Sequence, residues 1–183
     1  MPSFDFYDAG PIRKVATNLF YGWGYNFYRL ENQLRADDQL IRAKAASLLG
    51  LAMSYVEKAE SNYRREFLPP PSRQHPFPDA NAVAAAQKLE RLSKSIGSLE
   101  LTLHQQPVPE NDRMTQRFRK EAPTLQQLIA QDELLVGRCE MLRSLLENQP
   151  AAAILENLSS IESGVESIHT SLQQRAAILM QPA

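Results

Sequence analysis

The sequence predicts an all-α fold, an elongated antiparallel bundle of about five helices with long hairpins and proline-rich connectors. Two observations lead to this expectation. Apolar residues recur every three or four positions over long stretches, which is the period of one helix face. The sequence also contains no alternating β-branched run and no Asn-Gly or Asp-Gly hairpin turn. Prolines divide the chain into lengths that suit bundle helices.

The first helical pattern begins beside Pro11 and carries a stripe made of Ala16, Leu19, Trp23, Phe27, Leu30 and Leu34. A second stripe follows in the same phase, with Ile41, Ala45, Leu48, Ala52, Tyr55, Ala59 and Tyr63. The pattern allows either a hairpin near Ala36–Asp38 or one helix over residues 12–67, which would be about 80 Å long. We favour the hairpin, with Asp37 or Asp38 as the cap of the second helix.

Three more helices are predicted, after Asp79, after Pro123 and after Pro150. Their apolar positions keep a period near 3.5 residues, which is typical of coiled-coil-like packing. The stripes contain Ala85, Leu89, Leu92, Ile96, Leu99 and Leu103; then Leu125, Leu128, Leu135, Cys139, Leu142 and Leu146; then Ile154, Leu158, Ile161, Val165, Ile168, Leu172 and Leu179. Asp132 interrupts the fourth stripe at a position that allows a buried carboxylate, and Arg175 interrupts the fifth.

Length and composition indicate one domain over residues 1–183. We expect an aromatic arm at 1–10, a proline-rich connector at 68–78 and a basic connector at 107–122. The formal net charge of -1 gives no electrostatic reason to bind nucleic acid or an anionic membrane. No apolar run is long enough to span a bilayer, and the single Cys139 excludes an intrachain disulfide. These features favour a cytoplasmic protein without a membrane partner.

The stretch from Asn18 to Leu30 contains six aromatic residues in thirteen positions, including the only Trp of the chain. Trp23 and Phe27 continue the apolar stripe and are expected to be core aromatics. Tyr21, Tyr25 and Tyr28 form a second stripe on the opposite side of the helix. The arm adds Phe4, Phe6 and Tyr7, which either cover these tyrosines or join them in an interface. Tyrosine combines a large apolar area with a polar tip, and so suits contact surfaces.

Several other clusters suggest chemistry only weakly. Glu162, Glu166 and His169 are the best candidates for metal ligands, but the chain lacks the second Glu-x-x-His pair of a di-iron bundle, and Glu100 with His104 has the wrong spacing. We therefore expect no metal and no cofactor. Arg113, Arg117, Arg119 and Lys120 surround Phe118 and form a possible nucleic-acid contact, although a solvated connector explains them better.

Two further features are better explained by a structural role than by a catalytic or ligand-binding role. Cys139 lies on an apolar stripe and is expected to be a small core residue, not a nucleophile. The prolines of the connector favour a stiff crossover, with a ligand for an aromatic groove as the alternative.

These observations favour a non-enzymatic helical module that binds a protein partner or itself, as a homo-oligomer, through an aromatic helix face. A metal- or cofactor-binding bundle, possibly an enzyme, is the first alternative. A weak nucleic-acid contact through residues 113–120 is the second.

Overall fold

The computed structural model describes residues 5–24, 34–71, 73, 77–106 and 122–180. Its regular elements, in chain order, are α1 (Ala9–Gly22), α2 (Leu34–Phe67), α3 (Ala80–His104), α5 (Ala122–Leu146), α6 (Ala151–Glu156) and α7 (Leu158–Met180). Every regular element in these residues is helical, which confirms the predicted all-α bundle. None of the described helices is long and apolar enough to cross a bilayer.

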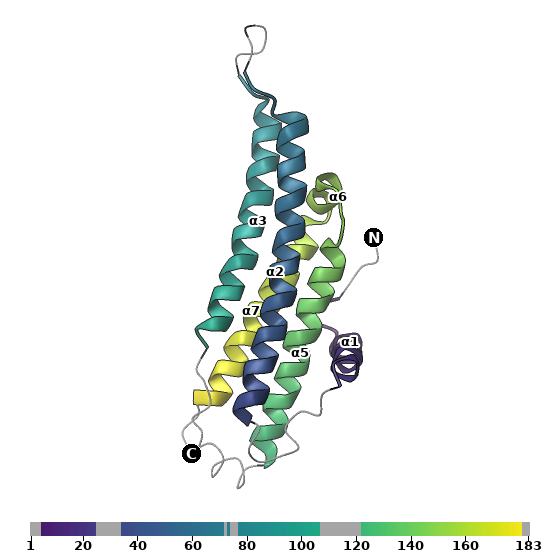
Figure 1. Ribbon diagram of the computed structural model, residues 1–183, viewed down its shortest axis with the longest axis vertical. Helices are drawn as coiled ribbons and strands as arrows, with labels where there is room; N and C mark the ends of the chain where they lie inside the picture. The colour runs from purple at the N-terminus through teal and green to yellow at the C-terminus, as the bar shows by residue number, and fades with distance from the viewer. Residues whose placement is uncertain (1–4, 25–33, 72, 74–76, 107–121, 181–183) are drawn as a thin grey trace.

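Four long helices form the body of the molecule. α2 packs on α3 and α5, and α7 packs on the same two helices, so that α2 and α7 are diagonal to one another. Helices that follow each other along the chain run in opposite directions along the long axis (Figure 1). Many buried residues lie on the predicted stripes, and Leu89, Ile96, Leu103, Leu135 and Leu142 are among those with almost no exposed area. Other buried residues lie beside the stripes: Phe20, Leu49, Val56 and Val136. The helical period of apolar residues therefore places a large part of the core, but not all of it.

The boundary between the first two helices differs from the prediction. α1 ends at Gly22, and Gly24 follows with a positive φ of 66°. α2 then runs without interruption from Leu34 through residues 36–38. The favoured hairpin near Ala36–Asp38 is therefore wrong, and so is the single helix over 12–67. Asp38 does not cap a helix, because its carboxylate is buried and bonded to two arginines.

The predicted fifth helix is divided into α6 and α7 by a turn at Asn157. The side-chain amide of Asn157 donates to the carbonyl of Ala153 at 2.8 Å, and this local bond competes with regular helix geometry. Helix α3 begins as predicted, because the Asp79 side chain accepts a hydrogen bond from the Ala82 backbone N–H at 2.8 Å.

α2 and α3 extend beyond the ends of α5 and α7, so that the last turns of α2 and the first turns of α3 project as a two-helix arm (Figure 1). α6 lies beside the base of this arm and contacts both of its helices. Helix α1 is not part of the four-helix body. It packs against the outer side of α5.

Candidate functional site

A buried network of charged side chains joins three helices at the end of the bundle opposite the arm. Arg175 of α7 donates from Nε to Oδ1 of Asp132 on α5 at 2.7 Å, and from Nη2 to Oδ1 of Asp38 on α2. Arg42 donates to Oδ2 of Asp38 at 2.7 Å and to the carbonyl of Gln106 at 3.0 Å. The network holds two carboxylates and two guanidinium groups, so the formal charges balance. Such pairing of buried opposite charges suits a structural role better than proton transfer.

The N-terminal segment is held by a second buried arginine. Arg138 of α5 donates from Nε to the carbonyl of Phe6 at 3.0 Å, and from Nη1 to the carbonyl of Ser167 at 3.1 Å and to the Ser171 hydroxyl. Burial lowers the pKa of this guanidinium. Arg138 therefore bridges the N-terminal segment and α7.

Two glycines provide the space into which this segment packs. A Cβ at Gly164 would lie 2.7 Å from Cζ of Phe6, and a Cβ at Gly137 would lie 2.4 Å from the carbonyl oxygen of Ile12. Phe6 is only 2% exposed, so its prediction as an interface residue is wrong. The ring is buried because Gly164 leaves a hole that only a residue without a side chain can provide.

Of the remaining aromatic residues predicted as contact or core residues, two are exposed and one is partly buried in the described part of the chain. Tyr7 and Tyr21 are 60% and 88% exposed, as a contact surface requires. Trp23 packs partly against the core, with its ring centroid 5.8 Å from that of Phe20 and 5.0 Å from Lys44 Nζ. The other four predicted aromatics lie outside the described residues: Phe4, Tyr25, Phe27 and Tyr28.

The candidate metal ligands are not brought together. Glu162 and Glu166 are exposed, and His169 Nδ1 lies 3.9 Å from Glu166 Oε1 as a surface pair. In the part of the chain that the structure describes, no group of three or more His, Cys, Asp or Glu side chains could hold a metal ion. The basic cluster, Arg113, Arg117, Arg119 and Lys120, lies outside the described residues.

Cys139 is fully buried in the core, as the stripe predicts. Burial raises the pKa of its thiol to about 12, so the thiolate needed for nucleophilic attack is not formed near neutral pH.

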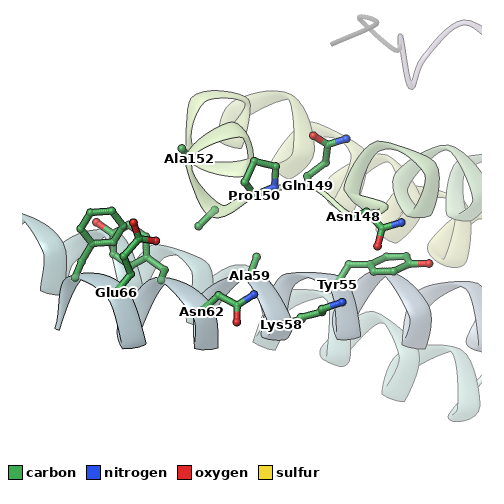
Figure 2. A pocket seen from close by; sticks show the side chains of 12 residues that line it. Tyr55, Lys58, Ala59, Asn62, Glu66, Asn148, Gln149, Pro150 and Ala152 are labelled. Atoms are coloured by element: carbon green, nitrogen blue, oxygen red, sulfur yellow. The ribbon is translucent and has the colours of Figure 1, made fainter. Parts of the chain in front are cut away.

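A groove of about 460 Å³ lies between the C-terminal half of α2 and the turn that joins α5 to α6. Its α2 side consists of Tyr55, Lys58, Ala59, Asn62, Tyr63, Glu66 and Phe67, and its other side of Asn148, Gln149, Pro150, Ala151 and Ala152. Figure 2 shows Glu66 at one end of the groove, Tyr55 and Asn148 at the other, and Ala59 and Asn62 between them. The groove is therefore open along α2, with an aromatic side chain towards each end.

The ends of the groove are fixed by local contacts. Tyr63 and Phe67 lie one helical turn apart, and their ring centroids are 4.6 Å from each other. At the opposite end the Tyr55 hydroxyl donates to Glu147 at 3.5 Å, and Glu147 is paired with Arg143 at 3.2 Å. The hydrogen bonds from Arg143 to Glu140 and the nearby carboxylates raise the pKa of Arg143, which keeps this anchor charged.

The wall opposite α2 depends on a turn that the sequence encodes locally. Asn148 has a positive φ of 54°, a conformation that Asn tolerates better than most residues, and the Gln149 N–H donates to the Leu146 carbonyl at 3.2 Å. Pro150 then precedes α6. The apolar periodicity of the sequence does not predict this groove. The available signal was the pair of tyrosines, Tyr55 and Tyr63, in an otherwise aliphatic stripe.

No family model matches this chain, and neither curated proteins nor solved structures gave a match.

Proposed function

We propose that this protein is a non-enzymatic helical module that binds other protein segments, and that the groove between α2 and the α5–α6 turn is its principal binding surface. The groove itself carries the proposal. It is long, open and lined by aromatic, amide and small side chains, which is the composition of a surface that accepts a peptide.

The contacts of the other polar clusters support a binding role over a catalytic one. The carboxylates of the buried network are bonded to arginines, and the Cys139 thiol is buried with a raised pKa. Lys58, Asn62 and Glu66 line the groove and are exposed, and their polar groups can hydrogen bond to a peptide backbone. The exposed Tyr7 and Tyr21 offer a second contact surface on the N-terminal side.

A peptide selection on the immobilised full chain tests this function. Ala152 is exposed at the edge of the groove, and Ala152→Trp fills the groove without altering a core position. Ala177→Trp places the same side chain at an exposed position of α7, which does not line the groove. A phage-displayed library of random peptides should yield binders that recognise the wild type and Ala177→Trp but lose at least about tenfold in affinity for Ala152→Trp. Binders that ignore Ala152→Trp, or a selection without enrichment, would refute the groove as the binding surface.

A further inference from the structure

The proline-rich connector follows the groove directly along the chain. Pro69, Pro70 and Pro71 are exposed and begin two residues after Phe67, which lines one end of the groove. Three successive prolines favour the polyproline II conformation, in which the backbone carbonyls are not used internally. Aromatic-lined grooves bind such segments, because prolines pack on the rings while nearby donors bond to the free carbonyls.

The groove offers both components. Tyr55, Tyr63 and Phe67 supply rings, and the side-chain amides of Asn62, Asn148 and Gln149 supply donors. Helix α2 therefore forms one wall of an aromatic-lined groove and leads directly into three successive prolines. From these features we infer that each groove binds the Pro69–Pro71 segment of a second copy, so that two arms pair side by side about a two-fold axis. This inference rests on the proposed binding function of the groove.

Occupancy by the same copy is disfavoured by the direction of the chain. The prolines continue from the end of α2 and must lead to Asp79, which caps α3 beside α2. The centre of the groove, at Ala59 and Asn62, lies about 10 Å back along the α2 axis from Phe67, and Pro70 lies beyond that end of the helix. A chain that left α2 at Phe67 would have to reverse its direction immediately to reach the centre of the groove. The prolines of an antiparallel second arm can reach the same place while they continue in the direction of their own α2 helix.

The two-fold arrangement is self-complementary in charge and in apolar surface. If Pro69–Pro71 of one arm lie beside residues 60–62 of the other, the axis passes close to Glu66 and Phe67, because the helix rises about 1.5 Å per residue and polyproline II about 3.1 Å. Arg65 of one copy and Glu66 of the other are then offset by about 3 Å along the axis, within reach of these two long side chains, and the same contact occurs twice. Both side chains are exposed, and neither forms an ion pair among the described residues. The Tyr63–Phe67 ring pairs also approach each other close to this axis, which covers the 49% exposed ring of Phe67.

Sedimentation equilibrium of the full chain over a wide concentration range tests the inference. We expect a reversible dimer for the wild type and for Ala177→Trp. Ala152→Trp, and separately the triple variant Pro69→Ser, Pro70→Ser, Pro71→Ser, should weaken dimerisation by at least about tenfold. Circular dichroism, with helix content equal to wild type, shows that each variant has folded. Unchanged dimerisation of both folded variants would overturn the inference.

Mixing the two variants gives a second test, whose expected result could not be produced by misfolded chains. The Ala152→Trp chain retains its prolines, and the triple serine variant retains an open groove. An equimolar mixture should therefore form a heterodimer through one proline contact, at concentrations at which each variant alone is monomeric. A mixture that stays monomeric would contradict the reciprocal arrangement.

A synthetic peptide with the sequence of residues 66–79 separates this inference from the proposed function. Fluorescence anisotropy should show that it binds the triple serine variant and not Ala152→Trp. If library peptides bind the groove but this peptide does not, the inference fails and the proposed function stands. If the peptide binds but the wild type is monomeric, the groove takes prolines from a different protein, and the second-copy occupant is wrong. If no peptide binds, both fail.

Discussion

Arg175 on α7 and Asp38 on α2 are bonded to each other across the diagonal of the four-helix body, 137 residues apart in the chain. Neither side chain has more than 1% of its area exposed. The same guanidinium bonds Asp132 on α5, so one arginine connects three helices whose apolar faces would otherwise allow several alignments. We interpret the network as a device that selects one arrangement of the helices.

Replacing Arg175 with Met should strongly destabilise the fold, because both carboxylates lose the guanidinium that they share while they remain buried. We expect the free energy of unfolding to fall by about 3–5 kcal/mol in urea titrations at neutral pH. Lys94→Met, which removes an exposed partner of Glu90, is the matched control. It should leave the urea concentration at the midpoint of unfolding unchanged. Equal effects of the two substitutions would show that the network is not buried as described.

Gly137→Ala should displace α1 from α5, because the added Cβ would meet the backbone carbonyl of Ile12 at 2.4 Å. Overpacking of this kind destabilises by about 1–3 kcal/mol. Trp23, the only tryptophan, lies at the end of α1, so its fluorescence reports the unfolding of this helix. In a urea titration the fluorescence change of the variant should occur at a lower urea concentration than that of the wild type.

Gly50→Ala is the opposite case, because a Cβ there meets nothing within 4 Å. The substitution should stabilise α2 by up to about 1 kcal/mol through helix propensity alone. If Gly137→Ala were also stabilising, the close contact with Ile12 would be refuted.

The thiol of Cys139 should make stability fall as the pH rises from about 9 to about 12. Its pKa is raised from 9.0 to about 12 by burial, so the unfolded chain loses this proton first. Within that window the contribution is about 1.4 kcal/mol per pH unit. Comparison with Cys139→Ala isolates it, because the variant should show a smaller slope even though its absolute stability differs. A native thiol that reacts with a disulfide reagent at neutral pH as fast as the unfolded chain would contradict the burial.

Tyr21→Ser should change the free energy of unfolding by no more than about 0.5 kcal/mol, because the ring is 88% exposed. Phe20→Ser, at the adjacent buried position, should destabilise by about 3 kcal/mol. Extending the first variant to Tyr25→Ser and Tyr28→Ser should preserve helical content and reduce partner capture if the tyrosine stripe is a contact surface. Loss of helical content in the triple variant would assign these residues to the core instead.

Part of this architecture follows from local rules. The stripes containing Leu89, Ile96 and Leu142 predict buried helix faces because a helix repeats its direction every 3.6 residues, whatever its neighbours are. The Asp79 cap is equally local, since the bond to Ala82 spans three residues. The sequence pattern predicts too late an end for the first helix, because the apolar period continues past Gly24. A single residue with left-handed backbone geometry does not change this period, so periodicity alone does not reveal it.

Most of the helices and much of their apolar faces can thus be predicted from the amino-acid pattern, because these features depend on contacts within a few residues. The tertiary structure decided which helices are neighbours, and with them the pairing of Arg175 with Asp38 and the burial of Phe6 over Gly164. It also decided that Tyr55, Tyr63 and Pro150 line one groove. These features depend on the space left between elements far apart in the chain, and no local periodicity encodes that space.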